Sequence, residues 1–299
     1  MVAYLLRRAF YIPAVLLVVT FLAFAAIQLQ PGDCLADLER VDPEAAQRLR
    51  EELGLDRPVW VQYARWLGSF RRGLGVSCTR RISAVTYLFQ GGAWARSLSL
   101  AGAALLLSLG LGVPLGLLAA LRQGGLSDYL IRSASAFSLA LPHFLIALSL
   151  VLLLFWLGFG SSQWGLLPPL AVVVLAQWAT LARHMRAYLL DVLNQPYIQV
   201  ARSKGLSERL VNCKHALRNA LHPLLGLMGF WLPSLFESTI AVSIVMRYPT
   251  VELNLWDAIV TQDQYVVASG LFILGGVLMV SNLLADVALA WADPRIRYD

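Results

Sequence analysis

The sequence predicts an all-α membrane protein whose helices cross the bilayer six times. Of its 299 residues, 58% are hydrophobic and 14% are charged, whereas a soluble domain carries about 45–50% apolar and about 25% charged residues. A water-soluble fold cannot bury so much apolar surface, and a disordered chain needs low hydrophobicity. Lipid is therefore the expected solvent for much of the chain.

Six apolar stretches approach or exceed the roughly 20 residues that one helical crossing takes. Their limits are 9–29, 94–121, 133–157, 166–182, 223–246 and 267–291. Backbone in lipid must satisfy its own hydrogen bonds, so helices are expected; barrel strands would alternate over about ten residues. The first stretch exceeds the apolar part of a secretory signal, about 7–15 residues, so we expect an uncleaved anchor rather than a cleaved signal.

Basic residues near the stretch ends predict the orientation. Arg7 and Arg8 precede the first stretch, which places the N-terminus in the cytoplasm, and six crossings return the C-terminus there. Residues 183–222 hold seven basic and two acidic residues on the same side. The net charge of +6 is thereby assigned to cytoplasmic helix ends and not to nucleic-acid binding. The loop after the first stretch holds nine arginines, but loops of about 60 residues cross largely regardless of charge.

This topology divides the chain into three parts. Residues 1–30 form an N-terminal segment with the first transmembrane helix, and residues 31–93 form an extracytoplasmic loop with amphipathic helices. Residues 94–299 form a core with five transmembrane helices, which includes the cytoplasmic segment 183–222. Three cysteines are too few and too scattered for a zinc site. Cys34 and Cys78 share the oxidising side and can pair there.

Two helices are expected within the loop 31–93. Asp42 suits the N-cap, Pro43 the first helical position and Gly54 the stop of the first helix. The second follows Pro58 and has one apolar, largely aromatic face made of Val59, Tyr63, Trp66, Leu67 and Phe70. That face is expected to lie on the bilayer or to pack on the transmembrane helices; the alternative is a dock for an external partner.

The segment 183–222 is expected to fold as a helix–turn–helix below the membrane. Gly205 can supply a left-handed turn between the two halves, and Ser207 can cap the second half. That half carries apolar Leu210, Val211 and Ala216 on one side and basic Arg209, Lys214 and Arg218 elsewhere. The segment is either a solvated basic loop or a rigid lever that inserts into a groove on a cytoplasmic partner.

The sequence lacks the motifs of an energy-consuming or hydrolytic enzyme. Lys204 follows Ser203 and Lys214 follows Cys213, so neither lysine can belong to a phosphate-binding P-loop. Neither HExxH nor GxSxG occurs. No catalytic residue, cofactor or metal is therefore expected. Ionisable and polar groups at membrane depth are costly and often functional, which makes His143, Gln177, Glu237 and Asn282 candidates for lining a pathway, whereas Asp286 is expected near the inner interface.

Motifs spread along nearly the whole chain resemble one family. They read Tyr4-Leu5-Leu6-Arg7-Arg8, Pro31-Gly32-Asp33, Leu53-Gly54-Leu55-Asp56-Arg57-Pro58, Gln62-Tyr63, Gly73-Leu74-Gly75-Val76-Ser77, Pro114-Leu115-Gly116, Ala201-Arg202-Ser203-Lys204-Gly205-Leu206-Ser207, His215-Ala216-Leu217-Arg218-Asn219-Ala220-Leu221-His222-Pro223 and Asp293-Pro294-Arg295-Ile296-Arg297. In this order they resemble the permease subunits of the peptide/opine/nickel class of binding-protein-dependent ABC importers. The resemblance implies a type I importer fold and a subunit without catalytic activity in the inner membrane.

The resemblance also implies partners and a mechanism. A second homologous permease, two ATP-binding subunits and an extracytoplasmic solute-binding protein are expected, with alternating access driven by the ATPases. Segment 183–222 becomes the coupling segment, with ATPase-coupling residues Gln199, Ala201, Arg202, Lys204, Gly205, Leu206, Ser207 and Glu208. The chain departs from the family pattern at Gln199, Ser243 and Thr250, where an acid, a glutamate and a glycine are usual.

The resemblance leaves the substrate open. Di- or oligopeptides are expected first, while nickel complexes, opines and glutathione are handled by relatives of the same class. Two further hypotheses come from other classes: a self-sufficient channel or secondary transporter, and an intramembrane enzyme. Co-purification of an ATP-binding subunit would separate them.

Overall fold

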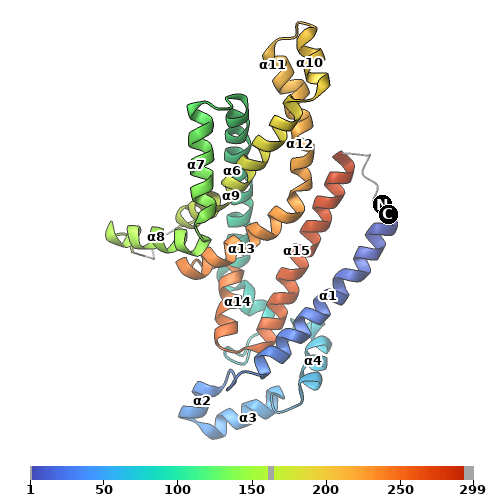
Figure 1. Cartoon of the computed structure of the whole chain (residues 1–299). Coiled ribbons are helices and arrows are strands. Elements are labelled where there is room, and N and C mark those ends of the chain that lie inside the picture. The colour runs from blue at the N-terminus through green and yellow to red at the C-terminus, as the bar shows by residue number, and fades with distance from the viewer. Residues whose placement is uncertain (1, 161–164, 293–299) are drawn as a thin grey trace. The chain divides into compact units, whose positions relative to one another are not determined.

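A computed structural model describes residues 2–160 and 165–292 (Figure 1). The described chain divides into two compact units. The first holds residues 2–97 and 249–280, and the second holds residues 98–248 and 281–292. The C-terminal motif 293–297 lies outside the described residues.

The first unit is helical apart from one isolated β-bridge between Val76 and Ser83 in the part that the structure describes. Its elements are α1 (Val2–Gln28), α2 (Ala36–Val41), α3 (Pro43–Leu53), α4 (Val59–Gly68), η1 (Phe70–Arg72), α5 (Ala84–Phe89), η2 (Gln90–Gly92), the start of α6 (Ala93–Leu121), α14 (Val251–Val260) and most of α15 (Gln264–Ala292).

The second unit contains the remainder of α6 and the helices that follow it. These are α7 (Leu126–Ala140), α8 (His143–Trp156), α9 (Leu167–Leu193), α10 (Pro196–Ser203), α11 (Glu208–Leu210), η4 (Val211–Ala216), α12 (Leu217–Gly226), α13 (Met228–Met246) and the end of α15. The described part of the chain is all-helical apart from the isolated bridge, as the sequence predicts.

The number of crossings is not confirmed as six. Three helical stretches in the described chain are long and apolar enough to span a membrane: Phe10–Gln28, Ala84–Leu121 and Gln264–Val287. A fourth consists of α7 and α8, which are bent by 95° within the apolar stretch that was expected at 133–157. The bend follows from Pro142, because proline pushes the preceding residue out of the helical region, and Leu141 is extended at φ −91° and ψ 125°.

The fourth and fifth expected crossings also differ from the prediction. The stretch 166–182 lies within the longer α9, whose C-terminal half carries Arg183, Arg186 and Asp191. The stretch 223–246 is divided between α12 and α13, and only Trp231–Met246 counts as a shorter apolar helix. Judged by length and composition alone, the helices of the described chain give fewer membrane crossings than the six that the apolar stretches of the sequence predict.

The two predicted helices of the loop 31–93 are confirmed. The Asp42 side chain accepts a hydrogen bond from the Ala45 amide at 2.9 Å, and Gly54 ends α3 in a left-handed conformation at φ 69°. On α4, Trp66 is fully buried against Phe24 and Phe272, and its indole N–H donates to Ser269 at 2.9 Å. The aromatic face of α4 therefore packs on α1 and α15.

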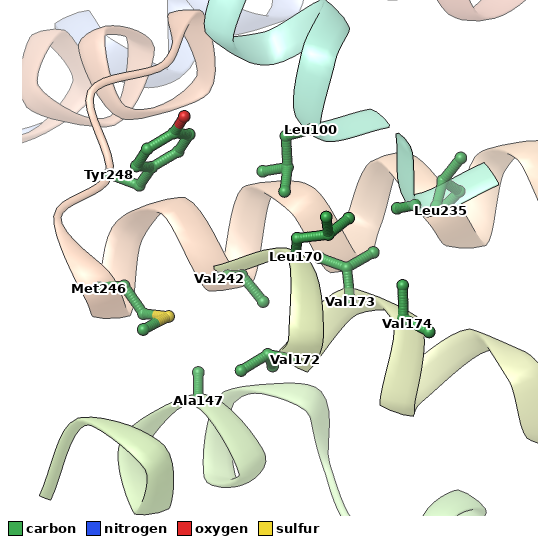
Figure 2. Close-up of a cluster of buried hydrophobic side chains, with 11 residues drawn as sticks. Leu100, Ala147, Leu170, Val172, Val173, Val174, Leu235, Val242, Met246 and Tyr248 are labelled. Atoms are coloured by element: carbon green, nitrogen blue, oxygen red, sulfur yellow. The ribbon is translucent and has the colours of Figure 1, made fainter. Parts of the chain in front are cut away.

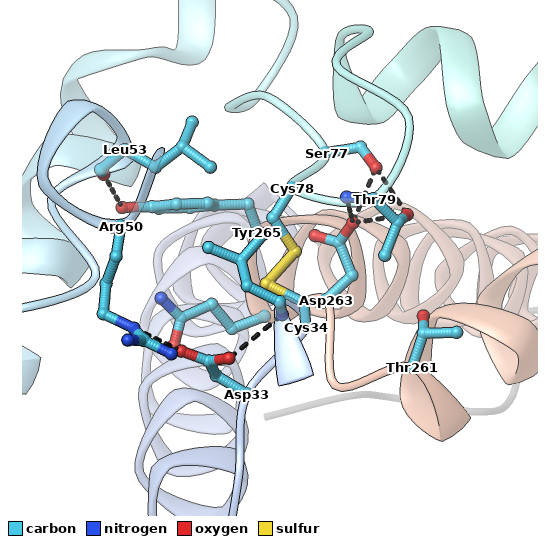
Figure 3. Close-up of a disulfide and its surroundings, with 12 residues drawn as sticks. Asp33, Cys34, Arg50, Leu53, Ser77, Cys78, Thr79, Thr261, Asp263 and Tyr265 are labelled. Carbon is cyan, nitrogen blue, oxygen red and sulfur yellow. Dashed lines mark hydrogen bonds and ion pairs between the residues drawn. A yellow bond between two sulfur atoms is a disulfide. The ribbon is translucent and has the colours of Figure 1, made fainter. Parts of the chain in front are cut away.

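Cys34 and Cys78, whose shared oxidising side allows them to pair, form a disulfide (Figure 3). It joins the segment that follows α1 to the segment that precedes α5, and Cys78 is buried beside Leu35 and Leu49. A small unit with little core often depends on such a cross-link. The loop 31–93 is thereby closed on itself.

The core of the second unit lies where α8, α9 and α13 meet (Figure 2). Ala147 of α8, Val172 and Val173 of α9 and Val242 of α13 are fully buried there. In the same unit, α6 approaches the backbone and the Cβ atoms of α9 closely at Gly112 and Gly116. A Cβ on Gly112 would lie 2.8 Å from the Trp178 carbonyl oxygen, and a Cβ on Gly116 would overlap the Ala182 carbonyl oxygen. Small residues spaced by four allow this close backbone approach.

Candidate coupling segment and pathway residues

The turn of the coupling segment is closed by backbone hydrogen bonds. α10 ends at Ser203, and Gly205 adopts φ +74°, as the sequence predicts. The Leu206 amide donates to the Ala201 carbonyl at 3.4 Å and the Gly205 amide donates to the Arg202 carbonyl at 2.9 Å. This pair of bonds is the Schellman motif, which requires a left-handed residue and favours glycine. The turn is consequently fixed by the backbone alone.

Apolar side chains attach the segment to α9. Ile198 and Ala201 of α10 and Val211 and Ala216 of η4 are buried and share a cluster with Leu189. Two expectations are wrong in detail. Leu210 is 39% exposed and does not join this cluster, and Ser207 occupies the N-cap position of α11 without making a side-chain capping bond.

An ion pair spans the turn at the surface. Arg202 Nε and Nη2 donate to the two carboxylate oxygens of Glu208 at 2.9 and 3.3 Å. Both side chains are largely exposed, so the pair contributes on the order of 0.2–1 kcal/mol. It orients the first turn after Gly205 more than it stabilises the segment.

The remaining predicted coupling residues lie on an exposed surface. Beside them, Val200 and Tyr197 of α10 are 52% and 43% exposed. The eight predicted residues divide into buried Ala201, half-buried Leu206, and exposed Gln199, Arg202, Lys204, Gly205, Ser207 and Glu208. We call the exposed face of α10 with Tyr197, Gln199, Val200 and Lys204 the coupling face.

Sequence reasoning missed the π-helical turn η4. The stretch Val211–Ala216 has wider turns than an α-helix, and no residue type in it signals this geometry. Such turns often occur at functional sites. Asn219, just after it, donates to the Tyr197 hydroxyl at 3.0 Å and so ties α12 back to α10.

Two of the four predicted pathway residues are brought together in the second unit. His143 at the start of α8 lies 2.9 Å from the Ser238 hydroxyl, through its Nδ1. Gln177 of α9 is buried and donates to the same hydroxyl at 2.7 Å and to the Ser234 carbonyl at 3.0 Å. A polar network therefore crosses α8, α9 and α13. Ser234 and Ser238 have no distinguishing sequence signal.

Glu237 and Asn282 are placed differently. The exposed Glu237 lines a hollow of about 370 Å³ together with His143 and Pro142. Asn282 lies half-buried on α15, and its side-chain oxygen has no hydrogen-bond partner among the described residues. The structure thus brings three predicted residues to one region and leaves Asn282 outside their network.

The departures from the family pattern have local structural roles or none. Thr250, at the place of the usual glycine, is the N-cap of α14 and accepts from the Leu253 amide at 3.3 Å. Gln199 keeps a polar group on the coupling face. The Ser243 hydroxyl is buried without a partner among the described atoms, and nothing in the structure explains it.

Ion pairs and a buried carboxyl surround the disulfide (Figure 3). Arg50 donates to Asp33 at 2.8 Å and to Glu39 at 3.0 Å, and these bonds raise the pKa of Arg50 above its ordinary value. Asp263, just before α15, is fully buried and accepts from the Ser77 hydroxyl at 2.6 Å. Burial raises the pKa of Asp263, while hydrogen bonds from Ser77 and Thr79 act in the opposite direction.

Together these features define a multi-pass helical membrane component with an exposed, basic helix–turn–helix. Residues 112–298 match the family described as "Binding-protein-dependent transport system inner membrane component". Residues 1–88 match a second family model, which describes the N-terminal region of such membrane components. The chain belongs to this family. It is a permease subunit of an ABC importer and a multi-pass protein of the inner membrane.

Full-length relatives support the assignment. The oligopeptide transport system permease protein AppB of Bacillus subtilis is 33% identical over 319 residues and covers 100% of both chains. A putative peptide permease protein of Brucella ovis is 32% identical, with 99% of each chain covered. The dipeptide transport system permease protein DppB of Lactococcus lactis is 30% identical over 99% of this chain and 100% of its own length.

Proposed function

We propose that this chain is a non-catalytic permease subunit that passes di- or oligopeptides across the inner membrane by alternating access. The names of its relatives support peptides as the substrate class. Nickel complexes, opines and glutathione are alternatives within the same class of importer. The lack of a P-loop lysine in the sequence supports ATP hydrolysis by other subunits.

The proposed assembly contains a second permease, two ATP-binding subunits and an extracytoplasmic solute-binding protein. Both termini of this chain lie in the cytoplasm, and the loop 31–93 lies outside. Residues 1–30 serve as the first anchor and residues 94–299 as the transport core. The disulfide within the loop supports this orientation, because disulfides persist on the oxidising side of the membrane.

The exposed coupling face is the observation that best supports the proposed role of this segment. A segment that transmits movement between subunits must be rigid, and the side chains that contact the partner must be exposed. The Schellman turn at Gly205 fixes the shape through the backbone, while Gln199, Val200 and Lys204 stay exposed. ATP-driven closure of the partner subunits would therefore move α10 as a body, and differential contact in the two states would shift the equilibrium of the core.

The polar network of the second unit is the proposed pathway wall. Polar groups in lipid-embedded helices ordinarily face a bundle interior or a water-filled cavity. His143 and Glu237 share a hollow, and Gln177 positions the Ser238 hydroxyl that His143 contacts. Asn282 is a separate candidate on α15.

Site-specific photo-crosslinking in the assembled importer tests the coupling face. A photoreactive side chain at Val200 should crosslink to an ATP-binding subunit. The matched control is Trp60 on α4, which is 69% exposed in the loop 31–93 and should give no such product. An ATP-binding subunit crosslinked from Trp60 but not from Val200 would overturn the proposed orientation and the coupling role together.

A further inference from the structure

Two arginines of the second unit line one hollow, and neither makes an ion pair within 4 Å in the described chain. Arg132 of α7 and Arg183 of α9 border a hollow of about 280 Å³, together with Tyr129 and Ser133. Neither arginine takes part in an ion pair within the described chain. Two like charges around one space repel each other, which favours an anion between them.

The nearby acid is already engaged. Asp128 of α7 is buried and receives two bonds from Arg186, at 2.7 and 2.9 Å, and a third from the Gly124 amide at 3.0 Å. This bidentate pair has the geometry that arginine and carboxylate prefer. Asp128 is therefore bonded to Arg186 and attracts Arg132 only through space, so the two arginines leave a net positive charge around the hollow.

The donor set of the hollow suits an oxyanion. Besides two guanidinium groups it presents the hydroxyl-bearing side chains Tyr129 and Ser133, and no carboxylate lines it. Guanidinium groups bind carboxylate and phosphate oxygens through parallel N–H bonds. Both chemistries fit the hollow itself, so the surroundings must distinguish a substrate carboxylate from a lipid phosphate.

The surroundings favour a passing substrate. Arg183 also borders a second hollow of about 400 Å³ with Thr180, His184 and Leu139. Thr180 and His184 border a third hollow with Ser234, and Leu139 borders the one that contains His143 and Glu237. Each hollow shares at least one lining residue with another and carries at least two polar side chains, although Leu181, Leu227 and Trp231 make the third hollow mainly apolar. A lipid needs polar contacts at its head group and continuous apolar contacts along its tails, and the polar side chains in every hollow interrupt such a surface.

We propose that Arg183 and Arg132 form a binding site for the free carboxylate of a substrate moving along these hollows. The inference rests on the proposed peptide permease function and adds the chemical group that the permease itself recognises. Arg183, which borders two of the hollows, makes the central contact. The recognised group is the C-terminal carboxylate that every unmodified peptide carries.

Arginine-selective labelling tests the site directly. The complete importer, reconstituted in phosphatidylcholine vesicles, is treated with phenylglyoxal, and labelling of each arginine is measured by mass spectrometry. Trialanine at millimolar concentration should slow labelling of Arg183 and Arg132 at least fivefold, and trialanine amide less than twofold. Arg122, exposed at the end of α6 and outside the hollows, is the control and should not respond. Equal rates with acid and amide would overturn the proposal.

The same labelling in vesicles with an anionic lipid distinguishes a substrate carboxylate from a lipid phosphate. Vesicles with 30% phosphatidylglycerol should label as phosphatidylcholine vesicles do. If phosphatidylglycerol protects both arginines and trialanine adds nothing, the site belongs to lipid phosphate and the carboxylate proposal is wrong.

Uptake by the same vesicles separates this inference from the proposed function. With one binding protein throughout, the ratio of trialanine to trialanine amide uptake should fall about tenfold in Arg183→Gln, recover partly in Arg183→Lys and stay unchanged in Arg122→Gln. An unchanged ratio in Arg183→Gln contradicts the carboxylate site alone. ATP-independent uptake, or uptake of neither peptide by the unsubstituted importer, contradicts the peptide importer function even where the labelling result stands.

Discussion

The loop 31–93 and the coupling segment are both polar excursions between apolar helices, yet they are held in opposite ways. Side chains hold the loop: a disulfide, the Arg50 ion pairs and the buried Trp66. The coupling segment is held by backbone bonds at Gly205 and by a few buried apolar groups, while its polar side chains stay exposed. The side chains of the loop bond mainly to one another, whereas the segment that we propose to contact a partner leaves its polar side chains exposed.

Removing the disulfide should have the largest effect on stability, and this effect should be confined to the loop 31–93. A cross-link over 44 residues stabilises by about 4 kcal/mol in the chain-entropy account. Cys34→Ala with Cys78→Ala should therefore raise amide hydrogen exchange over 31–83 strongly and leave 196–220 unchanged. Increased exchange in the coupling segment as well would show that the two regions are not independently held.

Replacing the turn glycine should affect only the coupling segment. Gly205→Ala places a Cβ at φ +74°, which costs about 1 kcal/mol or more, and no other atom lies within 4 Å to add a clash. Exchange over 196–210 should rise and ATP-coupled uptake should fall. Gly110→Ala, in an open helical position of α6, is the matched control and should be stabilising by roughly 0.5–1 kcal/mol. Unchanged exchange in Gly205→Ala would contradict a backbone-held turn.

The buried Asp263 should make the first unit sensitive to pH. Its raised pKa means that the folded chain binds this proton more tightly than the unfolded chain does. Its contribution to stability is therefore fully present below the ordinary aspartate pKa of about 3.9 and is lost as pH rises through the raised value. Comparing the melting temperature of the unsubstituted protein with Asp263→Asn from pH 4.5 to 8, the difference should move in favour of the variant as pH rises. A difference that is independent of pH contradicts this role.

The surface ion pair of the coupling segment should contribute least. Glu208→Gln removes the partner of Arg202 at the cost of at most about 1 kcal/mol, because both groups are exposed. Melting temperature should hardly change, and the effect should vanish at high salt. A loss larger than that from Gly205→Ala would mean that side chains, and not the backbone, hold the turn.

Much of this arrangement follows from local sequence. Asp42, Pro43, Gly54 and Gly205 act through the backbone within a few residues, so their caps and turns are confirmed at the predicted positions. Packing partners were harder to predict. The pairing of Asp128 with Arg186 joins residues 58 apart, and the shared Ser238 of His143 and Gln177 depends on three helices meeting.

The bend at Pro142 shows the limit of counting apolar residues. Hydropathy averages over both sides of the proline and predicts one crossing, whereas backbone sterics produce two helices at 95°. The buried acids Glu252 and Asp263 show a second limit. They lie among ordinary loop and helix residues in the sequence, and only tertiary contacts with Ser97 and Ser77 identify their burial.

The glycine contact between α6 and α9 has a mechanical consequence. With backbone against backbone at Gly112 and Gly116, no layer of deformable side chains separates the two helices. In the proposed mechanism, a movement of α10 would pass to α9 through the short connection at 194–195 and from α9 to α6 through this close contact, so that α6 and α9 would move together.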